Sequence, residues 1–514
     1  MSTLNPPWFA RGGFLLPGRT MITLEEFTHL AGTANVIPLV RTRLADMHTP
    51  VSAYLALREG GKSSFLFESV ERDEKIGRYS FVGVDPIRMI RARRGMVEIT
   101  GPSGTGARRE SIFDALERES GQYRQPAGET PEGFMGGYVG YIGYPAVAHI
   151  ERLRLHEPAG EEEDEAVLGL FGSLLRFDHS RQIVTLVHNV FLDGSCPVAE
   201  AYRRGKQALD AMELRLLRTA PAPQSFSYDP AGRTESADEE AYMRAVERAK
   251  EHITEGDIFQ VVLSRRISFP CAGDLFSVYR ALRMINPSPY LFFIDFGQTQ
   301  LAGSSPEVLV RVTGKTVEVL PIAGTRPRGA TGEEDDVLEE ELLRDEKELA
   351  EHVMLVDLGR NDVGRISAFG TVDVPVFKRV ERYSHVMHIV SEVRGTLREG
   401  AGPLEALRSC FPAGTVSGAP KVRAMEIIND LEPVSRGAYA GAVGYLGLNG
   451  SLDTCIAIRT IVRHGGRLSI QAGAGVVADS VPAREYRETV NKAKALMEAV
   501  EGASRGLLSL GVGQ

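Results

Sequence analysis

Residues 440–473 read AGAVGYLGLNGSLDTCIAIRTIVRHGGRLSIQAG, and this stretch decides the fold. Two apolar runs flank Asn449-Gly450, a pair that supplies the positive φ angles of a tight hairpin turn. Gly465-Gly466 joins IRTIVRH to RLSIQAG in the same way, and Gly314 lies between VLVRVT and KTVEVL. Because parallel strands need a long crossover, strands joined by tight turns are antiparallel. The sequence therefore predicts antiparallel sheets with helices packed outside, an α+β fold.

A short internal echo suggests which strands are neighbours. Residues 139–143 read VGYIG and residues 443–447 read VGYLG. Two Gly-aromatic strands of one design can lie side by side in a shared sheet, although five-residue matches also arise by chance. The echo predicts that the two halves of the chain share a sheet.

The composition changes along the chain of 514 residues. Residues 1–20 hold Pro6, Pro7 and Gly12-Gly13 and are predicted to be a disordered extension. Residues 221–240 (APAPQSFSYDPAGRTESADE) are typical of a linker. This divides the chain into an N-terminal region at 21–220 and a larger region at 241–500, followed by a tail at 501–514.

The bulk charge narrows the possible partners. A formal charge of −9, from 59 basic and 68 acidic residues, does not attract nucleic acid or an anionic membrane. The four cysteines form no C-x-x-C motif, which is typical of a reducing cytosol, so a cytoplasmic location is expected. No apolar run reaches the ~18 residues that a membrane span requires.

Two predicted helices each present a glutamate away from an apolar stripe. In the first, Asp345 caps the helix and Glu351 lies off the stripe formed by Leu349, Val353 and Val356. In the second, Pro482 suits an early helical position and Glu488 lies off the stripe formed by Tyr486, Val490, Ala493, Met497 and Val500. Two carboxylates can hold Mg2+, but spacing alone favours solvated helix faces.

Glycine-rich turns suggest anion binding. In PAGTVSGAPKVRAMEIIND (412–430), Ser417 or Gly418 can begin a helix whose free N–H groups favour an anion, with Lys421 close by. The glycine spacing is not that of a Walker A loop. AGAGVVADS (472–480) would let the backbone approach a ligand closely. Arg459 lies among apolar residues, where its partner is a substrate carboxylate or a structural acid.

Together the motifs resemble those of the chorismate-utilising enzyme family. The resemblance covers almost the whole chain and is dense between residues 240 and 497, in DIFQVVLSRR, NPSPYLFF, GSSPE, PIAGTRPRG, DEKELAEHVMLVDLGRNDVGR, YSHVMHIVSEVRG, CFPAGTVSGAPKVRAMEII, IAIRT, AGAGVVADS and EYRETVNKA. It continues in FLFESVERDEKIGRYSFVG (65–83). It implies two intertwined domains built around an antiparallel β-sandwich, with 241–500 as the catalytic, chorismate-binding region.

The resemblance also assigns roles. It implies that Glu351 and Glu488 hold Mg2+ against the C1 carboxylate of chorismate, and that Glu307 protonates the departing C4 hydroxyl. Substrate-binding positions are Gly324, Thr325, Tyr439, Arg459, Gly473, Ala474 and Gly475, with Lys421 added from its glycine-rich segment. Further active-site positions are Thr415, His388 and Gln260, although a histidine in SHVMHIVSEV would be a core residue more often than a catalytic one.

Two positions separate the members of the family. Isochorismate and salicylate synthases carry a lysine that activates water, where this chain has Gln260. Aminodeoxychorismate synthases often carry PIKGT, where this chain reads PIAGT with Ala323. The resemblance therefore implies a lyase that uses ammonia and chorismate to make anthranilate and pyruvate. An aminodeoxyisochorismate or aminodeoxychorismate synthase and a non-catalytic tryptophan-binding regulator are the alternatives.

The resemblance implies a partner and a regulator. The chain shows no glutamine amidotransferase module, so a separate amidotransferase subunit is expected to supply ammonia. In the family, an LLES-like run and NPSPYM bind L-tryptophan as feedback inhibitor, which makes 21–220 the regulatory region. The matching residues are Glu68, Ser69, Pro289, Tyr290 and Leu291, and Val443 and Tyr445 are expected to line the same site. LFES could instead be a plain edge strand.

Overall fold

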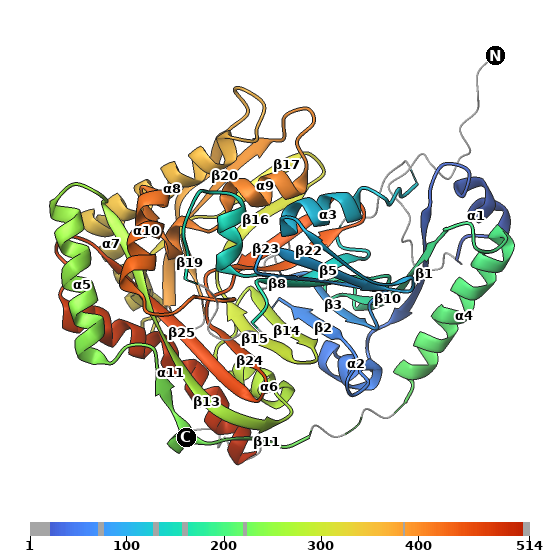
Figure 1. Ribbon diagram of the computed structural model, residues 1–514, viewed down its shortest axis with the longest axis horizontal. Helices are drawn as coiled ribbons and strands as arrows, with labels where there is room; N and C mark the ends of the chain where they lie inside the picture. The colour runs from blue at the N-terminus through green and yellow to red at the C-terminus, as the bar shows by residue number, and fades with distance from the viewer. Residues whose placement is uncertain are drawn as a thin grey trace.

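The computed structural model describes residues 21–69, 77–126, 133–156, 163–218, 221, 224–383 and 386–506. The extension predicted at 1–20 lies outside them, as does the tail beyond residue 506. Within the described residues, two large antiparallel sheets pack together, with helices on their outer faces (Figure 1). The predicted α+β fold with antiparallel sheets is confirmed.

The first sheet runs through strands from both halves of the chain. Its order is β1 (Val36–Leu44), β10 (Ile183–Phe191), β9 (Ser173–Asp178), β3 (Tyr79–Val84), β2 (Ser64–Glu68), β14 (Tyr290–Phe296), β15 (Thr299–Ser305), β24 (Thr460–His464), β25 (Arg467–Val476), β13 (Gln260–Gly273) and β11 (Phe226–Tyr228). Two short strands, β12 (Thr234–Glu235) and β21 (Gly418–Ala419), also pair with β13. The predicted linker at 221–240 thus contributes β11 and β12 to this sheet.

The second sheet mixes the two halves of the chain in the same way. Its order is β18 (Ile322–Pro327), β20 (Val386–Thr396), β17 (Thr316–Val319), β16 (Val308–Thr313), β23 (Leu452–Ile456), β22 (Ala442–Gly447), β7 (Gly137–Ile142), β8 (Ala166–Phe171), β4 (Arg88–Arg93), β5 (Met96–Gly101) and β6 (Gly104–Arg109). A further strand, β19 (Asp373–Arg382), pairs with β20.

The three predicted hairpins and the predicted echo are present. Tight turns join β22 to β23, β24 to β25 and β16 to β17. The two echo segments pair directly, with Gly140 opposite Gly444 in β7 and β22. A Cβ atom on Gly140 would come within 2.0 Å of the carbonyl oxygen of Val167, and one on Gly444 within 2.1 Å of that of Asp453. Glycine is needed at both positions because neighbouring backbone approaches there so closely.

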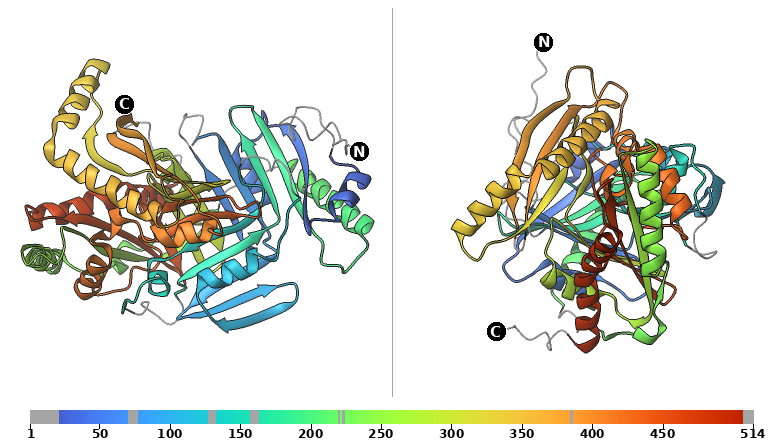
Figure 2. Two further views of the ribbon diagram at one scale, coloured as in Figure 1. Left: turned by 90° about the horizontal axis from the view of Figure 1, so that it is seen from above. Right: turned by 90° about the vertical axis from the view of Figure 1, so that its left-hand side faces the viewer.

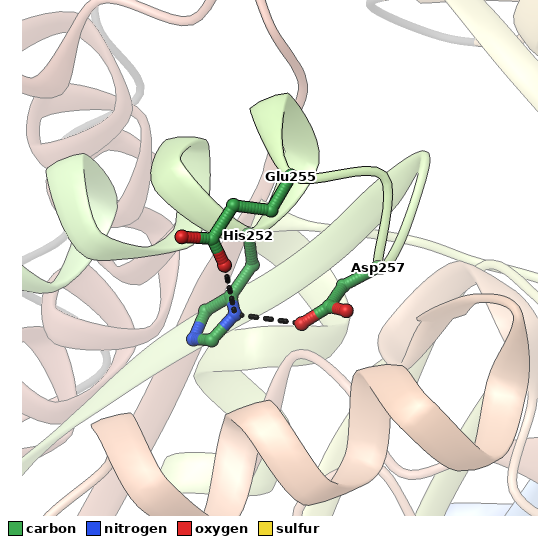
Figure 3. Close-up of side chains that lie close together, drawn as sticks. All are labelled: His252, Glu255 and Asp257. Carbon is green, nitrogen blue, oxygen red and sulfur yellow. Dashed lines mark hydrogen bonds and ion pairs between the residues drawn. The ribbon is translucent and has the colours of Figure 1, made fainter.

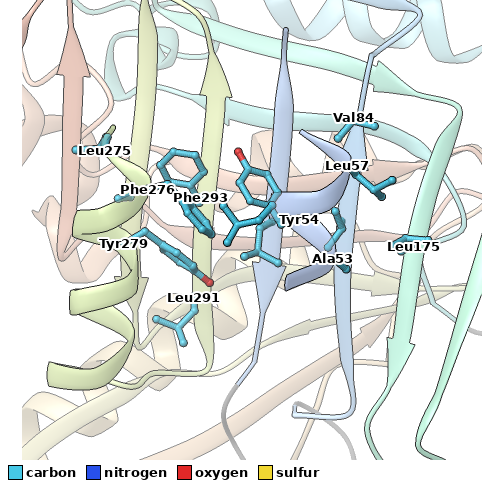
Figure 4. Packing of buried hydrophobic residues seen from close by; sticks show 14 of the residues in the cluster. Ala53, Tyr54, Leu57, Val84, Leu175, Leu275, Phe276, Tyr279, Leu291 and Phe293 are labelled. Atoms are coloured by element: carbon cyan, nitrogen blue, oxygen red, sulfur yellow. The ribbon is translucent and has the colours of Figure 1, made fainter. Parts of the chain in front are cut away.

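Helices cover the outer face of the first sheet. They are α1 (Leu24–Leu30), α2 (Pro50–Leu57), α4 (Val198–Leu216), α6 (Phe276–Ile285) and α11 (Pro482–Arg505). Figure 4 shows Tyr54 of α2 and Phe276 of α6 packed around Phe293 of β14, and the Tyr54 and Phe276 rings lie 4.6 Å apart. This apolar layer fixes α6 and α11 against the sheet.

The remaining helices cover the second sheet and one end of the molecule. On the second sheet lie α3 (Ile112–Ser120), α8 (Glu346–Gly364) and α9 (Pro403–Cys410) with the 3₁₀ turns η1 (Tyr144–His149) and η3 (Gly414–Val416). The end is formed by α5 (Glu239–Thr254), α10 (Lys421–Leu431) and α7 (Gly332–Arg344), with η2 (Pro230–Gly232) beside β13 (Figures 1 and 2). A third core lies between the sheets and joins Phe65 and Phe292 of the first to Val139 and Val443 of the second.

Candidate active site

One cavity of about 530 Å3 collects most of the predicted site residues. Its walls come from β13 and β25 of the first sheet, β18 and β20 of the second, and the helices α8 and α11. Twelve predicted residues line it: Gln260, Glu307, Gly324, Thr325, Glu351, His388, Thr415, Tyr439, Arg459, Gly473, Gly475 and Glu488. Segments up to 228 positions apart in the sequence, as Gln260 and Glu488 are, therefore meet at one place.

Two predicted substrate-binding residues do not line this cavity. Ala474 is fully buried, and it points to the opposite face of β25 from Gly473 and Gly475, since side chains alternate along a strand. Lys421 lies at the start of α10, and its Nζ is 2.8 Å from Asp362 Oδ2. The helix start predicted at Ser417 or Gly418 is wrong, because Gly418 forms β21 and pairs with Val261.

Two pairs of glutamates face each other across the cavity. Glu348 and Glu351 come from α8, and Glu485 and Glu488 come from α11, so each pair has the three-residue spacing that places side chains on one helix face. Burial raises the pKa of Glu348, and the charge of Glu351 adds to this. Burial likewise raises the pKa of Glu485, to which Glu488 contributes.

The crowded carboxylates suit a divalent cation. Gln260 Nε2 donates to Glu351 Oε1 at 3.3 Å, and Lys492 Nζ pairs with Glu488 Oε1 at 2.7 Å, so both predicted metal ligands point into the shared space. Mg2+ uses few protein carboxylates and keeps other positions for water or substrate oxygens. A cation here would offset the repulsion among four acids, so the residues present fit the predicted Mg2+.

The apolar stripes predicted for the helices α8 and α11 are partly wrong. Val353 and Val490 were placed on the apolar stripes, yet they are 37% and 41% exposed. On α11, Thr489 and Leu496 are buried instead. The sequence interpretation also missed Glu348 and Glu485 as site residues; the signal was a Glu-x-x-Glu spacing repeated in both helices.

Glu307 is an acid with a raised pKa on the cavity wall. It follows β15 and lines the cavity, and burial raises its pKa to about 7. The Thr415 hydroxyl and the positive charges of Lys492 and Arg459 oppose this shift. At neutral pH a substantial fraction of this carboxyl group is therefore protonated, as a general acid requires.

Arg459 supplies positive charge to the cavity. Its backbone has φ +48°, a conformation that L-residues seldom adopt. Its Nη1 atom donates to Asn286 Oδ1 at 3.4 Å, and burial lowers its pKa while the charge of Glu307 opposes this. No carboxylate ion pair of Arg459 occurs among the described residues, so the second sequence interpretation, a structural acid partner, is not supported there.

Two glycines of β25, Gly473 and Gly475, line the cavity. A Cβ atom at Gly473 would lie 2.8 Å from Tyr439 Oη and 2.9 Å from the Leu263 carbonyl oxygen. One at Gly475 would lie 2.9 Å from Gln260 Nε2. Glycine is therefore needed at both positions because protein atoms approach so closely, and the turn predicted at 472–480 is in its first part the end of strand β25.

His388 is held in one orientation. Its Nδ1 atom is 2.9 Å from the Gly324 carbonyl oxygen and 3.1 Å from Thr325 Oγ1. Donation from Nδ1 to that carbonyl leaves Nε2 unprotonated in the neutral ring. Burial lowers the pKa of His388, which keeps the ring neutral at physiological pH.

The predicted tryptophan residues divide between the core that lies between the two sheets and the core on the outer face of the first sheet. Tyr290, Val443 and Tyr445 belong to the core between the sheets, where the Tyr445 ring stacks on Phe134 at 4.3 Å. Tyr290 Oη donates to Asp453 Oδ1 at 2.7 Å. Pro289 is buried directly before β14.

Leu291 and Glu68 point to the other face, toward α6. They are partners across β14 and β2, and Figure 4 shows Leu291 beside Tyr279. Glu68 accepts a hydrogen bond from Tyr279 Oη at 2.5 Å and pairs with Arg283 at 3.0 Å. Ser69 follows Glu68 in the chain, and its buried Oγ atom has no hydrogen-bond partner among the described residues.

A second acidic group lies at the surface. Figure 3 shows His252 between Glu255 and Asp257, with Nδ1 2.9 Å from Asp257 Oδ2. Arg423 pairs with the same Asp257 oxygen at 2.6 Å. The cluster is therefore satisfied as a surface ion-pair group. In the part of the chain that the structure describes, no helix is long and apolar enough to cross a membrane.

Comparison with known proteins agrees with this geometry. Residues 62–498 match the model of the chorismate binding enzyme family. The chain is 45% identical over 493 residues to anthranilate synthase component 1 of Acetivibrio thermocellus, covering 94% of this chain and 98% of that protein. It is 48% identical over 478 residues to the protein of the same name from Thermus thermophilus, covering 91% and 99%.

A solved structure shows the same fold. The crystal structure of anthranilate synthase component I from Streptococcus pneumoniae superposes with a TM-score of 0.72 at 35% identity, covering 88% of this chain and 98% of that one. The family model spans most of the chain and the relatives match over nearly their full length. The chain belongs to the chorismate-binding enzymes, in the family of anthranilate synthase component 1.

Proposed function

We propose that the protein converts chorismate and ammonia to anthranilate and pyruvate, with Mg2+ bound in the cavity. One observation carries the proposal: a single cavity is lined by an acid whose pKa burial raises to about 7 (Glu307), a partly buried guanidinium group (Arg459), two glycines of β25 and two pairs of glutamates. These are the groups that a dicarboxylate with a departing hydroxyl requires. The names of the relatives support the same reaction.

Chorismate would bind through its two carboxylates. Arg459 offers a guanidinium group for one of them, and the exposed backbone of Gly473 and Gly475 allows close approach. Thr325 and Tyr439 add hydroxyl groups on either side. Glu351 and Glu488 would hold the Mg2+, which neutralises and orients the other carboxylate when bound.

The nucleophile is ammonia, because the cavity offers no suitable side chain at the positions that decide this. Gln260 and Ala323 both line the cavity, and neither can act as a base or attack a ring carbon. Lys492 also lines the cavity and carries an amine. That amine lies 2.7 Å from Glu488 Oε1 and 3.0 Å from the Gly473 carbonyl oxygen.

The reaction would proceed in two steps. In the first, ammonia bonds to C2 and loses one proton to solvent, and both ring double bonds shift, from C1=C2 to C1=C6 and from C5=C6 to C4=C5. The C4–O bond breaks as Glu307 protonates the departing hydroxyl to water. In the second, the proton at C2 is removed, the bond from C3 to the enolpyruvyl oxygen breaks, and pyruvate forms once its methylene carbon takes a proton. His388 Nε2 would assist the removal of the proton at C2.

A partner and a regulator complete the proposal. A glutamine amidotransferase subunit would release ammonia, consistent with the word "component" in the relatives' names. L-Tryptophan would inhibit by binding near Ser69, Pro289, Tyr290, Val443 and Tyr445, where the unsatisfied Ser69 hydroxyl is a free polar group for a ligand. Glu68 and Leu291 would shape the site from the α6 side of the sheet.

The test is a fluorescence assay with the purified chain, chorismate, Mg2+ and ammonium. Growing anthranilate fluorescence with equimolar pyruvate is the expected result. An aminated product without pyruvate would instead identify an aminodeoxyisochorismate or aminodeoxychorismate synthase. Tryptophan binding without any turnover of chorismate would identify a non-catalytic regulator.

A further inference from the structure

A second, smaller cavity lies directly behind Glu307. Its volume is about 50 Å3, and it is bounded by α8, by the turn from α9 into η3, and by the β17–β18 connection. A cavity needs roughly 10–15 Å3 to admit a water molecule. This space can therefore hold a few waters, but it is far too small for chorismate.

The two cavities share one wall. Glu307, Leu355 and Thr415 line both of them, so the Glu307 carboxyl group has a substrate side and a rear side. Thr415 Oγ1 is buried in this wall without a hydrogen-bond partner of normal geometry among the described residues. A buried hydroxyl of this kind is expected to bind water.

The rear cavity carries polar groups as well. Asp362 lines it and pairs with Lys421 Nζ at 2.8 Å, and the Cys410 thiol lies on the same lining. Burial raises the pKa of Asp362, while the charge of Lys421 opposes this. This placement also gives Lys421 a position behind the active site in place of the predicted contact with substrate.

We propose that the rear cavity is a water-filled proton inlet that returns a proton to Glu307 while the front cavity is occupied. The inference rests on the proposed function, in which Glu307 gives up one proton per turnover. Chorismate or its aminated intermediate would cover the side of Glu307 that faces the front cavity, and the rear cavity offers the acid a second path to solvent protons. Lys492 and Arg459 line the front cavity and not the rear one.

The proton balance is simple. Glu307 gives its proton to the departing C4 hydroxyl, which leaves as water, and becomes a carboxylate. A hydronium ion in the rear cavity then returns a proton to Glu307 and becomes water. Asp362 lines the rear cavity and would exchange protons with these waters.

The test uses substitutions that reduce the volume of the rear cavity at residues that do not line the front cavity. Gly359 lies in α8, and a Cβ atom there would lie 3.1 Å from Val319 Cγ2 and 3.4 Å from Pro321 Cγ, both on the rear lining. Gly359→Ala therefore inserts a methyl group, and alanine favours the helix. Ala413→Leu fills the same cavity from η3. Gly364→Ala is the matched control, because a Cβ atom there meets nothing within 4 Å on the same helix.

Anthranilate formation is measured in H2O and in D2O with the full chain, Mg2+ and saturating ammonium. General acid catalysis contributes about 10²–10⁴-fold to reaction rates. The kcat of Gly359→Ala and of Ala413→Leu is therefore expected to fall about tenfold or more. The KM for chorismate should change less than about twofold, and the solvent isotope effect on kcat should rise as proton return becomes limiting. Gly364→Ala should match the wild-type chain.

Two results would overturn the proposal. One is wild-type kcat and isotope effect in folded Gly359→Ala or Ala413→Leu. The other is a fall in kcat with an unchanged isotope effect and a raised KM, which indicates distortion of the front cavity. Failure of the proposed function looks different, because the wild-type chain itself would then make no anthranilate.

Discussion

At the scale of single residues, the position of Glu307 decides its chemistry. The tripeptide Ser305-Pro306-Glu307 does not by itself suggest an acid with a pKa near 7. Burial beside a large cavity raises the pKa to about 7, although Lys492 and Arg459 favour the charged form. The desolvation of the carboxylate therefore outweighs two nearby cations.

This pKa predicts a pH dependence. A raised folded-state pKa means that the protonated acid is present below about pH 7 and is lost as the pH rises through that value. At a fixed concentration of free NH3, kcat/KM for chorismate should therefore fall above about pH 7. Glu307→Gln cannot act as the acid, so its kcat should be about 10²–10⁴-fold lower than that of the wild-type chain. Its residual activity should not show the fall in kcat/KM above about pH 7. If Glu307→Gln kept the same pH profile, the fall in kcat/KM with rising pH would belong to another group.

The close contacts of Gly473 support a second prediction. Because a Cβ atom there would lie within 2.9 Å of two oxygens, Gly473→Ala should displace Tyr439 and raise the KM for chorismate. Overpacking of this kind costs about 1–3 kcal/mol, so about a tenfold effect is expected. Gly332→Ala is the control, because a Cβ atom there has nothing within 4 Å. Steady-state kinetics with both variants would decide, and equal KM values would contradict the close approach.

At the scale of elements, α8 and α11 act as a pair. Each helix has one polar face, and each turns a Glu-x-x-Glu pattern into the same cavity. Leu355 and Leu496 anchor the two helices beneath it. A metal site made in this way depends on the packing of both helices, since neither offers more than two nearby carboxylates.

Removal of either proposed metal ligand should therefore abolish Mg2+-dependent turnover. Glu351→Gln and Glu488→Gln keep the size of the side chain and remove its charge. Each is expected to weaken Mg2+ binding about 10–100-fold or more, measured by titration calorimetry with chorismate present. Glu498→Gln on α11 is the control, because Glu498 is exposed and does not line the cavity. Full Mg2+-dependent activity in either variant would remove that residue from the metal site.

At the scale of the whole molecule, a buried ion pair ties the cavity walls together. Arg436 and Glu432 are both almost fully buried, and their side chains lie 2.6 Å apart. Arg436 also donates to the carbonyl oxygens of Val416 and Val262, which line the cavity. Glu432 accepts from the backbone and hydroxyl of Ser264.

Breaking this pair should destabilise the protein. Glu432→Ala leaves a buried guanidinium without its acid, which costs about 3–5 kcal/mol. Urea unfolding should show this loss as a lower midpoint at unchanged slope. The exposed pair of Arg344 and Glu340 provides a control, because Glu340→Ala should change stability by less than about 1 kcal/mol. Equal midpoints for the two variants would show that the buried pair contributes little.

The mixing of the two halves of the chain gives a route for regulation. Tyr445 lies on β22, which pairs with β7 and leads through η1 to Tyr144, whose ring lies 4.8 Å from the Arg436 guanidinium. Ser69→Ala removes a buried hydroxyl that has no hydrogen-bond partner among the described residues, at the proposed tryptophan site. Inhibition by tryptophan should weaken about 5–150-fold with uninhibited kcat unchanged, the usual range of allosteric coupling. Inhibition curves that superpose on those of the wild-type chain would place the effector elsewhere.

The sequence by itself determined three hairpins, one pairing between the halves of the chain, and a set of residues that line one cavity. Asn449-Gly450, Gly465-Gly466 and Gly314 predicted three hairpins that are all present, because turn chemistry is local. The paired echo at Gly140 and Gly444 predicted that the halves share a sheet. The resemblance named twelve residues that line one cavity.

Only the tertiary structure decided which faces those residues present. Lys421 and Ala474 belong to the right segments, yet one pairs with Asp362 and the other points across β25. Glu348 and Glu485 looked like ordinary helix residues until α8 and α11 were packed around the same cavity. Leu291 and Tyr290 are adjacent in sequence but enter different cores. The reason is physical: turn geometry depends on a few neighbouring residues, whereas burial and electrostatic environment depend on segments hundreds of residues away.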